Sequence, residues 1–218
     1  METAVVRRFG GARRRLIEAL AERGLTDVRV LKAFDDIPRH LFVPTGVQHR
    51  AYEDAALPIG YGQTISQPWA HASALAALHL TGRERVLEVG TGSGFQSALL
   101  TRLVDQVFSI ERVAELATAA RDAFRACGID RVVQRVGDGT LGWPEFAPFD
   151  AILVGAAAPA VPEPLRTQLA VGGQLLMPIG ERDQQRLLWL RRTAAGWEEH
   201  WLDPVRFVPL IGAHGFPG

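Results

Sequence analysis

The chain has 218 residues, of which 47% are hydrophobic and 22% charged, a composition that favours one globular domain and excludes a disordered or fibrous protein. Lys and Arg together number 24, as do Asp and Glu, so the formal net charge is zero. This balance gives no reason to expect a nucleic acid or an anionic membrane as the main partner.

The N-terminal segment is rich in arginine, and the apolar run of a signal peptide does not follow it. Its arginines are Arg7, Arg8, Arg13, Arg14 and Arg15. They fit either an RNA-binding arm or the solvated face of a helix, and the helical spacing of Leu16, Ile17 and Leu20 favours the helix. No stretch reaches the roughly 18 apolar residues of a membrane span. We therefore expect no membrane partner. The single cysteine, Cys127, cannot form an internal disulfide, which fits a cytoplasmic protein.

Two helices are expected first, over residues 11–23 and 28–37, with Asp27 as the N-cap of the second helix and Pro38 as its stop. Residues 51–68 are rich in Gly, Pro and small polar residues and show neither helical nor strand periodicity. They predict a long loop, and loops of this length inside a compact domain are usually functional.

A further helix is expected from Pro68 to Leu80, with Ser66 near its N-cap. Beyond it, short apolar runs alternate with helical stretches, a pattern typical of βαβ units and a parallel sheet. The strands are expected at VLEV, VFSI, RVVQRV, DAILVG and QLLMPI, and the helices at residues 95–104, 113–126 and 163–170. QRLLWLRR and WEEHWLDPVRFVPL flank Gly196 without a helix between them, which indicates an antiparallel hairpin at the sheet edge.

The predicted architecture is a Rossmann-like α/β fold with a mostly parallel sheet, a C-terminal antiparallel hairpin and an N-terminal helical preface. Residues 1–218 are expected to form a single domain. Within it, residues 1–80 would hold the helical preface and the substrate and cofactor loop, and residues 81–218 would form the Rossmann-like core.

The strongest local signal is the stretch Val86–Gly94 (VLEVGTGSG), a strand that runs into a glycine turn before a helix. Gly90, Gly92 and Gly94 allow the chain to reverse tightly and allow a ligand to approach the backbone. The dinucleotide pattern G-x-G-x-x-G needs a glycine where this chain has Phe95, so NAD is not expected.

Three acids on or after successive strands narrow the choice of cofactor. Glu88 lies inside the strand before the turn, where it repels a pyrophosphate but favours the cationic methionine part of S-adenosylmethionine. Glu111 follows Gly90 by 21 positions (111 minus 90), where a carboxylate can accept both ribose hydroxyls. Asp138, after the third strand, is suited to accept a hydrogen bond from an adenine amino group. The ordered set predicts S-adenosylmethionine, and the alternative is a βαβ protein whose glycines only turn the chain.

Several separate stretches, found together in few families, carry a resemblance over almost the whole chain. They are RHLFVP (39–44), AYEDAALPIGYGQTISQP (51–68), VLEVGTGSGFQ (86–96), GDG (137–139), FDAILVGAA (149–157), residues 162–173 and FVPL (207–210). In these stretches the chain resembles the protein-L-isoaspartate O-methyltransferase family, and the GQTIS block is the most specific motif. Modest departures from the family pattern stand at Trp69, Phe95 and Ile211, and the last puts in doubt a C-terminal polar contact to the ligand.

The resemblance implies roles for individual residues. Ser66 matches the serine at the family's reaction centre, and Thr64 and His71 match residues beside the cofactor. The other implied cofactor contacts are Glu88, Glu111, Asp138 and Gly139, in agreement with the three acids above. From the residues alone, Ser66 fits a plain N-cap equally well, and His71 fits a partly buried structural histidine.

The activity that the resemblance implies is methyl transfer from S-adenosylmethionine to the free carboxylate of L-isoaspartyl residues in damaged proteins or peptides, which starts repair through a succinimide. S-adenosylhomocysteine would be the second product. A carboxylate is ionised at neutral pH and needs no general base, so His71 is expected to bind and not to transfer protons. We expect no metal, and a monomer. The alternatives are an acceptor of another kind (a modified-peptide aspartate, a nucleic acid or a small molecule) or a non-catalytic cofactor-binding protein.

Overall fold

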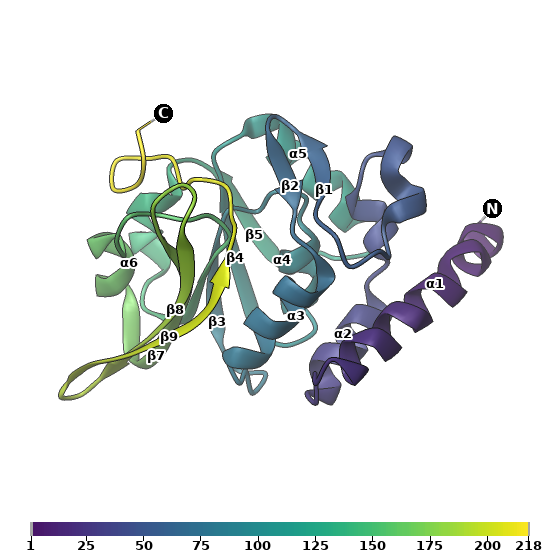
Figure 1. Cartoon of the computed structure of the whole chain (residues 1–218). Coiled ribbons are helices and arrows are strands. Elements are labelled where there is room, and N and C mark those ends of the chain that lie inside the picture. Colours follow the sequence, from purple (N-terminus) through teal and green to yellow (C-terminus); the bar gives the residue numbers. More distant parts are fainter. Residues whose placement is uncertain (1, 218) are drawn as a thin grey trace.

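The computed structural model describes residues 2–217, with side chains from residue 9 onward. Its centre is a seven-stranded sheet in the order β5-β4-β3-β6-β7-β8-β9. The strands are β3 (Arg85–Val89), β4 (Gln106–Glu111), β5 (Val132–Val136), β6 (Phe149–Val154), β7 (Leu169–Gly180), β8 (Gln185–Thr193) and β9 (Gly196–Val205). Figure 1 shows the N-terminal helices at one side of the molecule and the β8–β9 hairpin, the last two strands of the sheet, at the other.

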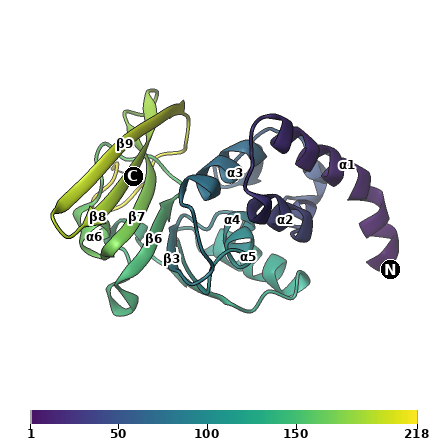
Figure 2. The same ribbon diagram turned by 90° about the horizontal axis from the view of Figure 1, so that it is seen from below.

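Strands β3 to β7 pair in parallel, whereas β8 and β9 run antiparallel to their neighbours. The helices are α1 (Glu2–Glu22), α2 (Val28–Asp36), α3 (Pro68–Ala77), α4 (Phe95–Leu100), α5 (Ala114–Ala126) and α6 (Glu163–Thr167). Figure 2 shows α1, α2 and α3 gathered at the end of the molecule opposite β8 and β9. The predicted Rossmann-like fold, with its antiparallel C-terminal hairpin, is confirmed.

The strand order creates a topological switch point at β3. The chain runs outward from β3 through β4 to β5 and then crosses back to β6 on the other side of β3. The loops after β3 and its neighbours therefore diverge at the carboxyl end of the sheet. In open α/β sheets this divergence leaves the crevice in which ligands bind.

The N-terminal helices form as expected, with one change in length. The side chain of Asp27 accepts hydrogen bonds from the backbone N–H groups of Arg29 (2.9 Å) and Val30 (3.2 Å), so it caps α2. Helix α1 begins at Glu2 and not near residue 11. The Gly10–Gly11 pair disfavours a helix locally, but the buried Phe9 ring stacks on His40 at 4.3 Å between centroids and holds this part of α1.

The arginines of α1 lie as a solvated helix face requires. Arg14 and Arg15 are exposed, whereas Leu16 and Leu20 are buried in the main core. The side chains of Arg7 and Arg8 lie outside the described residues.

The prediction of a long loop over residues 51–68 is wrong for its second half. The segment contains an antiparallel hairpin of β1 (Leu57–Gly60) and β2 (Gln63–Ile65). Tyr61 and Gly62 connect the strands with φ of 53° and 69°, and two successive positive φ values define the turn that matches the twist of a hairpin. Both strands are shorter than an alternating pattern needs in order to be recognised, and Pro58 and the Tyr-Gly turn hide them further.

Several helix ends differ from expectation by a few residues. Helix α3 ends at Ala77 and not at Leu80, and its N-cap is Gln67, which makes no side-chain capping bond. Helix α4 ends at Leu100 and not at residue 104, and α6 ends at Thr167 and not at residue 170, because β7 begins at Leu169. Ser66 is therefore not the N-cap of α3.

Candidate active site

The turn after β3 is built from glycines in the left-handed region. Gly90, Gly92 and Gly94 have φ of 93°, 52° and 85°, a backbone that residues with a Cβ atom rarely adopt. A Cβ atom on Gly94 would also stand 2.8 Å from the Phe124 ring of α5. This glycine therefore allows α4 and α5 to pack closely while the other two turn the chain at the sheet edge.

A pocket opens at this edge of the sheet, lined by the glycine turn, β2, α3 and the segment after β9. It collects most of the residues named by sequence reasoning. They are Thr64, Ser66, His71, Glu88, Gly90, Gly92, Glu111 and Gly139. Gly94 and Asp138 are not among its lining residues. The C-terminal segment 207–211, including Ile211, closes the opposite wall.

Glu88 is the most deeply buried acid of the pocket, with 1% of its surface exposed. Its Oε2 accepts hydrogen bonds from the hydroxyls of Ser109 (2.6 Å) and Ser97. Burial raises the pKa of Glu88 to about 7, although the two serine hydroxyls act in the opposite direction. Because a nearby cation favours the ionised form of such a group, this end of the pocket suits a positively charged ligand.

Glu111 ends β4 and faces the glycine turn. Its Oε2 accepts from the backbone N–H of Gly92 (2.7 Å) and its Oε1 from that of Val113 (2.9 Å). These two bonds fix the carboxylate at the pocket wall, where only 6% of the residue is exposed. Each oxygen keeps a further lone pair, so the group can still accept two hydroxyls of a sugar.

His71 projects from α3 into the same pocket and is neutral. Its Nδ1 is hydrogen-bonded to Gln96 Oε1, and because a carbonyl oxygen only accepts, Nδ1 carries the proton. Burial lowers the pKa of His71 to about 3, and the charge of Arg39 acts in the same direction. Its Nε2 is buried and has no partner among the described residues, so it offers an acceptor to a ligand N–H group.

Asp138 does not line the pocket, and its carboxylate accepts hydrogen bonds from the protein itself. Oδ1 accepts from the N–H and hydroxyl of Thr140, and Oδ2 accepts from the N–H of Ala213 at 2.7 Å. Burial alone would raise the pKa of Asp138, but these hydrogen bonds outweigh it and lower the pKa below its ordinary value. The neighbouring Gly139 does line the pocket, and a Cβ atom there would overlap Val89.

Arg39 is a site residue that sequence reasoning did not assign a role. Its guanidinium is 1% exposed and donates to the backbone oxygens of Ala51 and Ser66, both at 2.8 Å. Burial lowers the pKa of Arg39 to about 9, so it remains charged at neutral pH. Arg39 thereby holds the backbone of Ser66 at the rim of the pocket, and its place at the start of the RHLFVP motif was the signal for it.

Two negative findings apply to the described part of the chain. Between residues 2 and 217, no cluster of three or more His, Cys, Asp or Glu side chains is arranged to hold a metal ion. Over the same residues, none of the helices has the length and apolar character needed to cross a bilayer.

The sheet order, the glycine turn and the acidic pocket at the switch point define a Rossmann-like methyltransferase fold. The family model described as protein-L-isoaspartate(D-aspartate) O-methyltransferase matches residues 12–215. The chain therefore belongs to this family, and the resemblance noted in the sequence is confirmed.

Individual relatives agree with this assignment. The protein-L-isoaspartate O-methyltransferase of Roseiflexus castenholzii is 51% identical to the chain, and the match covers 95% of each protein. That of Dictyoglomus thermophilum is 48% identical, and the match covers 94% of this chain and 93% of the relative. A solved protein-L-isoaspartate O-methyltransferase superposes with a TM-score of 0.86 at 31% identity, over 93% of this chain and 67% of the other. A solved structure of a Plasmodium falciparum protein described as a putative protein-L-isoaspartate O-methyltransferase, in complex with S-adenosyl-L-homocysteine, superposes with a TM-score of 0.80 at 28% identity. The match covers 90% of this chain and 97% of the other.

Proposed function

We propose that the chain transfers a methyl group from S-adenosylmethionine to the free carboxylate of L-isoaspartyl residues in damaged proteins or peptides. The resulting ester starts repair through a succinimide. The observation that carries this proposal is the family match over residues 12–215, which coincides with an intact pocket from Ser66 to Glu111. Relatives that are 51% and 48% identical in sequence to the chain are named protein-L-isoaspartate O-methyltransferases.

The residues of the pocket fit S-adenosylmethionine. Glu88 suits a cation, Glu111 has lone pairs for the ribose hydroxyls, and the unpartnered Nε2 of His71 accepts from an N–H group. When bound, this cofactor supplies an electrophilic methyl group on a sulfonium and leaves as S-adenosylhomocysteine. Gly90, Gly92 and Gly139 would let it approach the backbone, and Thr64 would line its edge. Asp138 would act indirectly, because it fixes the turn that presents Gly139.

Ser66 would position the acceptor carboxylate. Its backbone oxygen is held by Arg39, and the capping position of α3 belongs to Gln67, so the hydroxyl of Ser66 is not used as a helix cap. A hydroxyl that donates to the carboxylate aligns the attacking oxygen with the methyl group. Alignment of this kind contributes about 7 kcal/mol or more to bimolecular reactions. No base is needed, since the carboxylate is already ionised.

We further propose that the enzyme is a single-domain cytoplasmic monomer that acts on protein and not on nucleic acid, with residues 1–80 and 81–218 as its two parts. The zero net charge and the unpaired Cys127 support this proposal. Neither feature favours a polyanionic partner or an oxidising compartment.

The test is transfer of a labelled methyl group to matched isoaspartyl, aspartyl and RNA acceptors, together with melting curves in S-adenosylmethionine and in NAD. We expect transfer to the isoaspartyl peptide alone and a higher melting temperature with S-adenosylmethionine alone, because a ligand stabilises the state that binds it. Label on RNA, or on aspartyl peptide at an equal rate, would refute the proposed acceptor.

A further inference from the structure

A second hollow adjoins the cofactor pocket and shares its rim at Thr64 and Ser66. It lies between α3 and the β8–β9 hairpin and is continued by the segment 201–208. We call it the flank groove. Because it opens at Ser66, a protein segment whose isoaspartyl carboxylate reaches the methyl group has to place its neighbouring residues there.

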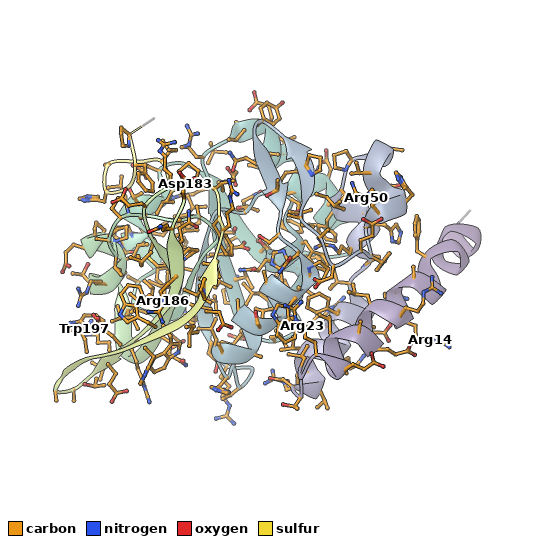
Figure 3. The ribbon with its side chains drawn as sticks, in the orientation of Figure 1. Arg14, Arg23, Arg50, Asp183, Arg186 and Trp197 are labelled. Carbon is orange, nitrogen blue, oxygen red and sulfur yellow. The ribbon has the colours of Figure 1, made fainter. Side chains whose placement is uncertain are left out.

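Each side of the flank groove carries a tryptophan with an arginine over its ring. Arg23 stands 4.3 Å from the centre of the Trp69 ring on α3, and Arg186 stands 5.8 Å from that of Trp201 on β9. Figure 3 labels Arg23 near α3 and Arg186 on β8, the two sides of the groove. Trp201 keeps 47% of its surface exposed, so this wall is open to an incoming peptide.

Arg186 lies on β8, opposite a β-bulge of β9. The pairing of β8 and β9 shifts between Arg186 and Leu188, which face Pro204 and Trp201, so β9 has one extra residue at this point. The guanidinium of Arg186 donates to the backbone oxygens of Leu202 and Trp201, both at 3.3 Å. These two bonds fix the guanidinium of Arg186 at the groove, and no carboxylate of the described residues forms an ion pair with it.

The charges of the flank groove are unequal. Its lining contains Arg23, Arg186 and Arg206 against a single acid, Asp203. Arg23 is neutralised by Asp54 at 2.9 Å, whereas Arg186 and Arg206 form no ion pair within the described part of the chain. Even with Asp203 counted, the groove keeps an excess of positive charge next to the reaction centre.

We propose that the flank groove selects isoaspartyl segments that carry an acidic residue close to the damaged one, and that Arg186 and Arg206 recognise this acid. The inference rests on the proposed function and adds a substrate preference to it. An arginine without an ion-pair partner can pair with a carboxylate through N–H bonds of its guanidinium. Such pairs at an exposed rim also speed association with a substrate of opposite charge.

The experiment uses isoaspartyl peptides that are identical except for one neighbouring residue, which is Glu, Gln or Lys. We expect kcat/KM to fall in the order Glu, Gln, Lys, with roughly a threefold to tenfold difference between the ends, as exposed charge pairs give. The preference should shrink between about 0.05 and 0.5 M salt because screening weakens exposed pairs. Arg206→Glu should abolish or reverse the order, and Arg186→Glu should do the same.

Arg186→Glu also removes two hydrogen bonds at the bulge, so Arg206→Glu, which removes none, keeps the test valid if the first variant does not fold. The matched control is Arg121→Glu on α5, an exposed residue outside the groove with the same change in net charge. Equal kcat/KM for all three peptides, or an order unchanged in Arg206→Glu, overturns the inference while the proposed function stands. If none of the three peptides is methylated, the proposed function itself is overturned.

Discussion

The cofactor pocket and the flank groove meet at Ser66 and differ in construction. We call them the cofactor half and the substrate half of the site. In the cofactor half, Glu88, Glu111 and His71 are 1%, 6% and 7% exposed, and each is fixed by hydrogen bonds. In the substrate half, Trp201 is 47% exposed and Arg206 has no ion pair among the described residues. A ligand of constant structure can be met by a buried and preorganised set of groups, whereas a damaged residue in many sequences needs an open surface.

This difference predicts where substitutions cost most. Removing one partner of a buried polar group leaves the other unsatisfied, at about 1–3 kcal/mol, whereas exposed ion pairs contribute only about 0–1 kcal/mol. Large effects on ligand affinity and on stability should therefore come from the cofactor half, and changes in substrate choice from the other half.

The largest expected effect is on stability, in Glu88→Gln without ligand. The pKa of Glu88 is raised by burial to about 7 in the folded protein. Protonated Glu88 therefore contributes fully to the free energy of unfolding below the unfolded-state pKa of roughly 4, and this contribution is lost as pH rises through about 7. Because glutamine cannot ionise, the variant should gain about 2–3 kcal/mol relative to the parent between pH 5 and pH 8. Denaturant unfolding of both proteins at several pH values measures this gain. If the difference between them does not change with pH, Glu88 is already ionised at pH 5.

Next in size is the affinity change in Glu111→Ala. The substitution removes a charged acceptor from the proposed ribose contact, which is worth about 1.5–3 kcal/mol, or roughly tenfold to hundredfold in the Kd for S-adenosylmethionine. Titration calorimetry measures it. Glu111→Gln keeps an acceptor for the turn N–H groups and should lose less affinity, and Glu115→Ala, an exposed acid of α5, serves as the control. An unchanged Kd in Glu111→Ala would remove this residue from the cofactor site.

Ser66 lines both the cofactor pocket and the flank groove, so Ser66→Ala tests the boundary between the two halves. It should lower kcat by about tenfold or more, from loss of one charge-assisted bond to the reacting carboxylate, while the Kd for S-adenosylmethionine and the melting temperature stay the same. Single-turnover rates and calorimetry measure the two effects. Thr118→Ala, an exposed hydroxyl residue of α5 outside both the pocket and the flank groove, should leave both unchanged. Normal turnover in Ser66→Ala would show that the hydroxyl has no part in the reaction.

The cofactor half was also the easier one to predict from the sequence. Strand periodicity and the glycines at 90, 92 and 94 are local signals, and parallel pairing brings Glu88 and Glu111 to one sheet edge. The orientation of Asp138 was beyond such reasoning, because its partner Ala213 lies 75 positions further along the chain. The burial of Arg39 likewise depends on partners 12 and 27 positions away, which periodicity does not encode. The β1–β2 hairpin is local, but its strands of four and three residues are too short to show an alternating pattern.

The smallest expected effect is in the pH dependence of kcat, which should stay within about twofold from pH 6 to pH 8. The acceptor carboxylate has a reference pKa of roughly 4 and is ionised throughout this range. His71 does not titrate there, since burial lowers its pKa to about 3, and saturating S-adenosylmethionine keeps Glu88 ionised because a cation favours its charged form. An amine or ring-nitrogen acceptor has to lose a proton, so its rate would climb through neutral pH. Single-turnover rates with an isoaspartyl peptide, followed by mild alkali on the product, separate the two cases: a steep rise near pH 6.5 with an alkali-stable methyl group would exclude a carboxylate acceptor.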